Sequence, residues 1–156
     1  MKKRDIYNAF KARLHYLMDV SWYAYFFSAG LEEAVMLEIA GGEIAWPNVG
    51  HNGGRPLFVV SFSGGDRTNQ TLKGDDVRET GVFSVNIEVE KGIGEDRAGD
   101  YADAVASLFP AGLRLTVGDD EGQIVITKPP SIRAGYPDDT CWRVPVVVNY
   151  HANAAL

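Results

Sequence analysis

Three histidines and several acidic turns carry the side chains of this 156-residue sequence that could do chemistry. A small hydrolase or metal-binding enzyme would use His51, His151, Asp75 or Asp76, because imidazole and carboxylate groups bind metals and transfer protons. His15 is the remaining histidine, and none of the three has a second ligand at zinc-like spacing. The acidic groups fall in turns, where Asp is favoured by local backbone hydrogen bonds. We therefore expect no catalytic residue, no metal and no cofactor.

A glycine turn and a single cysteine are the other chemical candidates. Gly92 and Gly94 precede a predicted helix, as in phosphate-binding turns, but Glu95 and Asp96 stand where an anion would dock. Cys141 has no recognisable His partner and no second cysteine, so we expect neither a thiol nucleophile nor an intrachain disulfide. The sequence thus favours an assembly protein over an enzyme.

Five aromatic side chains crowd into six positions and could serve as core or as a partner-binding surface. They cannot all face one side of a helix or strand, so some of them are expected at the surface. Aromatic residues are enriched at protein interfaces, which makes this cluster a candidate contact in an obligate oligomer. Both interpretations stay open for the set, which comprises Trp22, Tyr23, Tyr25, Phe26 and Phe27.

Two segments have the apolar spacing of amphipathic helices. Asp5 can act as an N-cap, and a helix is predicted over residues 5–18 with an apolar stripe of Ile6, Phe10, Leu14 and Leu17. A second helix is predicted after the glycine turn, ending before Pro110, with apolar positions at Ala98, Tyr101, Ala102, Val105, Leu108 and Phe109. Residues 20–42 are ambiguous, because residues 31–39 suit either a short helix or a strand.

Alternating apolar and polar residues predict the strands. The pattern is cleanest over residues 80–90, and further strands are predicted over 44–46, 57–62 and 142–150. Residues 113–117 and 123–127 are predicted to form a hairpin around the turn at residues 118–122. Residues 57–62 are apolar on both faces, as in the middle of a covered sheet. Pro145 has no backbone N–H, which predicts that the last strand lies at an edge or carries a bulge.

The order of these elements and the composition together predict the fold class. A chain of this length that is 46% hydrophobic suits one domain over residues 1–156. Helix, strands, helix, strands indicates α+β, with a mostly antiparallel sheet and two main helices packed on one face. The formal net charge of −6 argues against a nucleic-acid-binding surface. Residues 20–29 are too short a run to span a bilayer, so we expect no membrane partner.

Several short motifs in a fixed order resemble the tail terminator-like proteins of long-tailed bacteriophages and prophages. The resemblance covers residues 6–18 and 44–150, and the Ala-rich helix ending Leu108-Phe109-Pro110 belongs to it. The other motifs are Ile44-Ala45-Trp46-Pro47-Asn48, Pro56-Leu57-Phe58-Val59-Val60, Arg78-Glu79-Thr80-Gly81-Val82-Phe83 and Trp142-Arg143-Val144-Pro145-Val146.

The resemblance implies a small α+β subunit of the virion without enzymatic activity. Such subunits form a hexameric ring on the head-proximal end of the tail tube, stop its polymerisation and provide the head-joining surface. The implied partners are further copies of the chain, the tail tube protein and the head-tail connector or neck proteins. DNA would pass through the lumen without specific binding, and assembly would take place in the host cytoplasm. A head-tail connector or tail completion protein is the alternative within virion assembly.

The family supplies no catalytic residues, so the expected site is an interface. One candidate is the aromatic cluster, which would face a partner. The other is the long polar segment from Gly64 to Glu79, either a long mobile loop or the tip of an extended hairpin, which would reach the tube or a neighbouring subunit. Its candidate residues are Asp66, Arg67, Lys73, Asp75, Asp76, Arg78 and Glu79.

Overall fold

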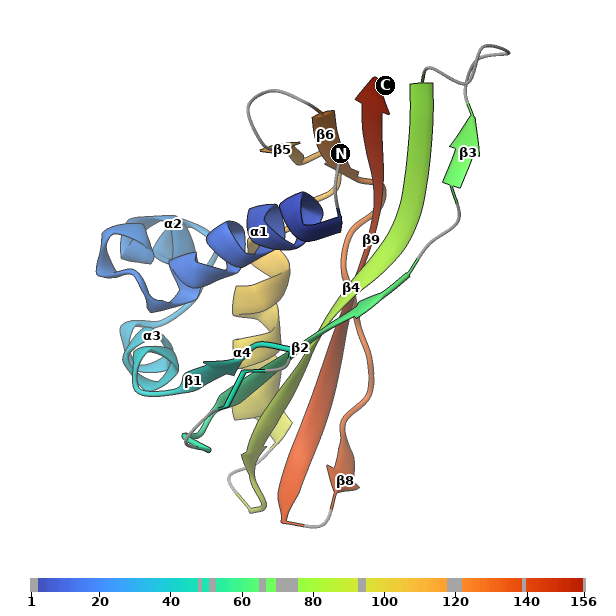
Figure 1. Cartoon of the computed structure of the whole chain (residues 1–156). Coiled ribbons are helices and arrows are strands. Elements are labelled where there is room, and N and C mark those ends of the chain that lie inside the picture. Colours follow the sequence, from blue (N-terminus) through green and yellow to red (C-terminus); the bar gives the residue numbers. More distant parts are fainter. Residues whose placement is uncertain are drawn as a thin grey trace.

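Two long antiparallel strands form the axis of the protein in the computed structural model (Figure 1). They are β4 (Asp76–Glu90) and β9 (Cys141–Ala155), and they pair along their whole length. The structure describes residues 3–47, 49–50, 53–64, 67–69, 76–92, 95–117, 122–138 and 140–155. The strand predicted over residues 80–90 is confirmed and starts four residues earlier than expected.

Shorter strands complete a curled sheet on both sides of this pair. The main order is β1-β2-β4-β9-β6-β5, with β3 on β4, and with β7 and β8 on β9. Their bounds are β1 (Glu43–Ala45), β2 (Leu57–Ser63), β3 (Arg67–Asn69), β5 (Arg114–Val117), β6 (Gly122–Ile126), β7 (Ser131–Ile132) and β8 (Tyr136–Asp138). The predicted hairpin of β5 and β6 is confirmed.

The expectation of a mostly antiparallel sheet is corrected, because the sheet is mixed. β1 pairs parallel with β2, whereas β4 runs antiparallel to both of its long neighbours, β2 and β9. A parallel pair needs a crossover connection, and residues 46–56 form it here between the two strands. The pattern of apolar residues did not reveal this, because alternation gives no strand direction.

The last strand is central, so the predicted edge position of the strand with Pro145 is wrong. Pro145 lies opposite Asn86 of β4, and its carbonyl accepts a hydrogen bond from the Arg133 N–H at 2.9 Å. The N–H and C=O of a strand residue point to the same side. The N–H that Pro145 lacks would therefore have pointed toward the segment of Arg133, and not toward β4. β7 ends at Ile132 and β8 begins at Tyr136, and Pro145 sits against this break.

Four α-helices lie together on one side of the long strands (Figure 1), where two main helices were expected. They are α1 (Lys3–Leu14), α2 (Tyr23–Ser28), α3 (Glu33–Ala40) and α4 (Glu95–Ser107). Two short 3-10 helices, His15–Met18 and Val20–Trp22, join α1 to α2. The ambiguous segment is therefore helical. None of the described helices is long and apolar enough to cross a membrane.

The core lies between the helices and one face of the sheet. The predicted stripe of α1 is fully or nearly fully buried, and Phe10 stacks on Phe83 of β4 with ring centroids 4.6 Å apart. Phe109, just beyond α4, meets both rings at 5.8 and 5.3 Å. These contacts fix α1 and α4 against the middle of the sheet.

One end of the sheet extends beyond the helices as an arm (Figure 1). The arm consists of residues 76–81 of β4 and 150–155 of β9, flanked by β3 and β6. The segment from Gly64 to Glu79 was expected to be a loop or the tip of an extended hairpin. Its described residues follow the hairpin alternative, because β3 pairs with residues 77–79 of β4.

Candidate functional site

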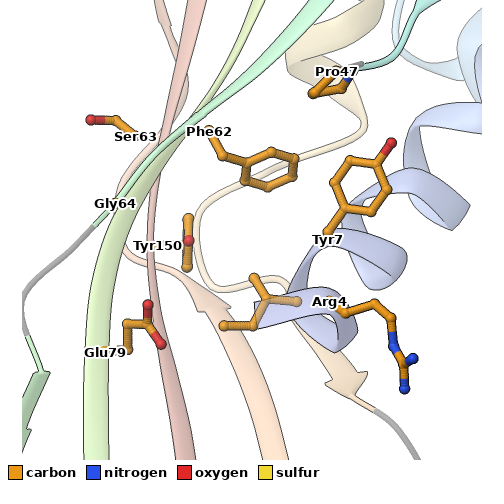
Figure 2. Close-up of a pocket in the computed structure, with 9 residues that line it drawn as sticks. Arg4, Tyr7, Pro47, Phe62, Ser63, Gly64, Glu79 and Tyr150 are labelled. Carbon is orange, nitrogen blue, oxygen red and sulfur yellow. The ribbon is translucent and has the colours of Figure 1, made fainter. Parts of the chain in front are cut away.

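A cleft of about 470 Å³ opens between the start of α1 and the sheet, at the base of the arm (Figure 2). Its walls are mainly apolar, and its charged residues, Arg4 and Glu79, come from α1 and β4. The remaining lining residues are Ile6, Tyr7, Pro47, Phe62, Ser63, Gly64 and Tyr150. Sequence reasoning identified Glu79 alone among these residues, because the others come from segments that are distant in sequence.

The aromatic walls of the cleft are held by ring contacts with their surroundings. Tyr7 meets Phe62 with ring centroids 5.4 Å apart and Trp46 at 6.2 Å. Tyr150 packs against Phe10 at 4.9 Å. Burial raises the pKa of Tyr7 and also that of Tyr150, and the carboxylate of Glu79 raises the latter further. Both phenols therefore stay neutral at physiological pH and present uncharged hydroxyl groups to the cleft.

Gly81 allows the ring of Tyr150 to lie across β4 beside the cleft. The two residues are directly opposite in the sheet, and a Cβ at Gly81 would lie 2.6 Å from the phenol oxygen. Real Cβ atoms do not approach other atoms so closely, so a larger residue would displace the ring. A glycine inside a regular strand was the available signal for this contact.

The aromatic cluster mostly packs inside the chain instead of forming one exposed surface. Trp22 stacks on Tyr16 with centroids 3.9 Å apart, and the guanidinium carbon of Arg13 lies 5.2 Å from the Trp22 ring centroid. Arg13 Nε donates a hydrogen bond to the Leu108 carbonyl at 2.7 Å. The Tyr25 hydroxyl donates to the carbonyl of Ser107, so both side chains satisfy carbonyls at the carboxyl end of α4.

The remaining members of the cluster divide between core and surface. Phe26 is fully buried in the core, so its side chain is not available for an interface in the folded subunit. Tyr23 is half-buried, and Phe27 is 44% exposed. The structure thus leaves Phe27 as the exposed residue of the predicted contact, whereas Trp22, Tyr23 and Tyr25 are all partly buried.

The polar segment contributes three candidate residues with described side chains. Arg67 Nε lies 3.4 Å from Glu79 Oε2, which joins β3 to β4. Arg78 Nε donates a hydrogen bond to Asn153 Oδ1 at 3.1 Å, which joins β4 to β9. These contacts stiffen the arm. Asp76 begins β4, its side chain lies outside the described part, and Asp66, Lys73 and Asp75 lie outside the described residues altogether.

The sheet face opposite the helices, which we call the bare face, is uncharged across its centre. Its side chains alternate with the buried ones, and Ser61 Oγ and Ser84 Oγ lie 2.6 Å apart at its middle. A depression of about 530 Å³ is lined by Thr80, Val82 and Asn149 of this face and by Lys128, a charged residue that follows β6. The central residues are Val59, Ser61, Ser63, Val82, Ser84, Asn86, Pro145, Val147 and Asn149, and none of them is fully buried.

Charged groups lie at the two ends of the bare face. Arg78 and Arg114 approach His151 at the arm end, and burial together with these two charges lowers the pKa of His151. At the opposite end, Arg143 pairs with Glu88 and lies 2.9 Å from Asp138. An uncharged centre with a charged rim is the arrangement found at protein interfaces.

The described residues contain one group that could approach a metal ion. Glu88, Asp138 and Cys141 offer ligand atoms within 4.8 Å of one another, but the guanidinium of Arg143 already pairs with both carboxylates. The group therefore acts as an ion-pair network, with a cation already supplied by Arg143. The histidines do not gather there either, since His15 lies against Trp46 and His151 lies on β9. His51 lies outside the described residues.

Comparison with known proteins places this fold among solved structures. One solved chain aligns with 97% of this chain and 96% of its own length, with 21% sequence identity and a TM-score of 0.62. A chain of the virion of a native gene transfer agent particle aligns over 80% of this chain and 87% of its own, with 12% identity and a TM-score of 0.49. No curated protein matches the sequence. The family model of the phage tail terminator protein matches residues 5–150, and the chain therefore belongs to this family of structural phage tail proteins.

Proposed function

We propose that this protein is the tail terminator subunit that assembles as a hexameric ring on the head-proximal end of the phage tail tube. The ring covers the growing end of the tube, stops its polymerisation and provides the surface to which the filled head joins. Family membership over residues 5–150 supports this function.

The bare face is the observation that carries the proposal. Its central residues on β2, β4 and β9 are small, β-branched or amide side chains without charge, and charged groups lie at its ends. Charged residues are depleted at the centres of protein interfaces, whereas a face meant for water has no such restriction. We place the tail tube contact on this face and on the adjoining arm, which carries Arg67, Arg78 and Glu79.

The charge of the subunit suits a ring through which DNA passes. The formal net charge is −6 at pH 7, so an acidic ring repels the phosphate backbone on average. Specific or tight DNA binding in the lumen would slow genome passage. The subunit therefore guides DNA without holding it.

Growth of tail tubes in the presence of the protein tests the proposed function. Purified tail tube protein is allowed to polymerise, and tube length is followed by electron microscopy with increasing amounts of the terminator protein. We expect tubes to stop growing when the terminator is present at about one ring per tube, because a cap acts only at an end. Tubes that continue to lengthen at an excess of the protein would contradict the proposal.

A pair of lysine variants tests the part assigned to the bare face. Ser61 on β2 and Thr116 on β5 are both exposed, so lysine at either position is compatible with folding. Ser61→Lys adds a charge to the centre of the bare face and is expected to abolish capping, since a buried unpaired charge is costly. Thr116→Lys is the matched control and is expected to cap normally. Equal capping by the two variants would show that the tail tube does not contact this face.

A further inference from the structure

The helical layer carries an exposed turn formed by residues 27–30, which we call the tip. Phe27 is 44% exposed, and Ser28, Ala29 and Gly30 beside it are also exposed. The backbone is fixed there, because the Gly30 N–H donates to the Phe27 carbonyl at 3.0 Å and the Leu31 N–H donates to the Phe26 carbonyl at 3.1 Å. Gly30 has a φ of 91°, the left-handed value that ends a helix in this way. Phe27 is thus presented on a preorganised turn, which lowers the entropy cost of binding.

The cleft beside α1 has the shape and lining to receive such a tip. Its volume of about 470 Å³ falls within the range of about 300–1,000 Å³ that is typical of pockets for organic ligands. Tyr7, Phe62 and Tyr150 supply aromatic walls, and edge or tilted contacts with an inserted phenyl ring are favourable. The apolar lining of the cleft therefore matches the apolar side chain of Phe27 on the tip.

The charges around the two features are complementary. Glu32 and Glu33 follow the tip directly and are exposed. Arg4 lines the cleft, its side chain is 74% exposed, and its Nε lies 3.9 Å from Asp5 Oδ1. Glu79 is the other charged residue of the cleft, and its carboxylate is already paired with Arg67. Opposite charges at the rim of a contact guide association and fix its register. A tip that enters the cleft therefore brings its acidic flank toward the Arg4 rim.

The cleft is lined by Arg4, Ile6 and Tyr7 at the start of α1. The helix before the tip, α2, lies beside the other end of α1 (Figure 1). Helix α1 has 12 residues, and a helix of that length spans about 18 Å. One copy therefore does not fill its own cleft with its own tip. A closed ring needs such a pair of unlike surfaces, because each subunit meets its two neighbours through different faces.

We propose that Phe27 of one copy inserts into the cleft of the next copy, with Glu32 and Glu33 beside Arg4, and that this contact links the subunits around the ring. The inference rests on the proposed function, since it specifies how the terminator subunits join. It assigns the occupant of the cleft to a second copy of this chain.

Cysteine cross-linking tests this contact in the full-length protein. Ser28→Cys and Gly64→Cys place thiols on the tip and at the cleft and leave Phe27 in place, because Ser28 is exposed and a Cβ at Gly64 would meet no atom within 4 Å. The native Cys141 is buried, and wild type serves as the control for it. The two single variants are mixed, assembled on tail tubes and treated with a short bismaleimide. We expect a covalent dimer in the mixture and a ladder of larger species when one chain carries both cysteines.

A matched control defines the background of this experiment. Thr116→Cys is exposed on β5, away from the cleft lining, and is mixed with Ser28→Cys in the same way. Caps that form without cross-linking above this background would overturn the tip contact and leave the proposed function intact. Failure of wild type to cap tubes would refute the proposed function. In that case, cross-linking of free copies in solution would show whether the tip and the cleft of two copies are in contact.

Self-association of the variants provides an independent measure. Phe27→Ser is expected to weaken association by about tenfold or more, as the loss of an aromatic anchor does. Leu37→Ser is the matched control, because Leu37 is 58% exposed on α3 and lies outside the tip. Glu33→Lys should also weaken association, and adding Arg4→Glu in the same chain should restore it. Equal association of the Phe27 and Leu37 variants would contradict the proposal.

Discussion

At the scale of single residues, the absence of a side chain at Gly81 gives the ring of Tyr150 its place beside the cleft. Gly81→Ala would place a methyl group 2.6 Å from the phenol oxygen of Tyr150 unless the ring moves. Overpacking of this kind costs about 1–3 kcal/mol in the free energy of unfolding. We therefore expect Gly81→Ala to unfold at lower denaturant concentration than wild type, with an unchanged m-value.

A second glycine provides the control for this prediction. Gly99 lies within α4, and a Cβ there meets no atom within 4 Å. Gly99→Ala should therefore stabilise the protein by about 0.5–1 kcal/mol, the usual gain in a helix interior. Equal effects of the two substitutions would show that Tyr150 does not restrict position 81.

The imidazole of His151 makes stability depend on pH. Its folded-state pKa lies below the ordinary value of 6.5, because of burial and the charges of Arg78 and Arg114. As the pH falls below about 6.5, the unfolded chain binds the proton first, so this group lowers the free energy of unfolding. Above that pH both states are neutral and the group has no effect.

Replacement of His151 tests this dependence directly. The free energy of unfolding of wild type and His151→Gln is measured by urea denaturation between pH 7.5 and the acid range. We expect the wild type to lose more stability than the variant once the pH falls below 6.5. Parallel profiles across this range would contradict the lowered pKa.

At the scale of elements, Arg13 and Tyr25 connect three helices. Arg13 of α1 and Tyr25 of α2 donate hydrogen bonds to the last carbonyls of α4, at Leu108 and Ser107. Arg13→Ala should destabilise the protein by about 1.5–3 kcal/mol, the range for a hydrogen bond from a charged group. Thermal denaturation of the variant measures this loss.

A double-mutant cycle shows whether the two donors act together. Tyr25→Phe removes only the hydroxyl bond and should cost about 1 kcal/mol. The guanidinium carbon of Arg13 lies 5.9 Å from the Tyr25 ring centroid, so the two effects should be coupled. Strict additivity of the two losses would indicate that the helices are held independently.

The residues of this connection show where sequence reasoning reached its limit. The spacing of Phe10 and Leu14 in α1 and of Leu17 in the 3-10 helix after it identified the buried stripe, because periodicity depends only on local sequence. The partners of Trp22 and Tyr25 lie on α1 and α4, and no pattern within residues 20–42 reveals them. The sequence therefore identified an unusual aromatic cluster and left its division between core and surface open.

Strand pairing shows the same division between local and distant information. Alternation predicted most of β4, and the hairpin of β5 and β6 followed from two patterned runs around a turn. The parallel pairing of β1 with β2 and the central place of Pro145 depend on which strands meet. The cleft is another product of this arrangement, since α1, β2, β4 and β9 contribute to it.

At the scale of the whole molecule, the order of motifs was more informative than any single residue. It indicated the phage tail terminator family, which matches residues 5–150. The family is one of structural phage tail proteins, so we look for function in the shape and charge of its surfaces. The bare face, the tip and the cleft are therefore the features that the proposed assembly uses.

Electron microscopy of tail tubes mixed with this protein tests the central claim most directly. Averaged images of tube ends give the presence, position and rotational symmetry of any added density. We expect a hexameric ring on one end of each tube, a bare opposite end and no further growth at the capped end. Tubes with two bare ends that keep growing, or protein bound along their sides, would contradict the account.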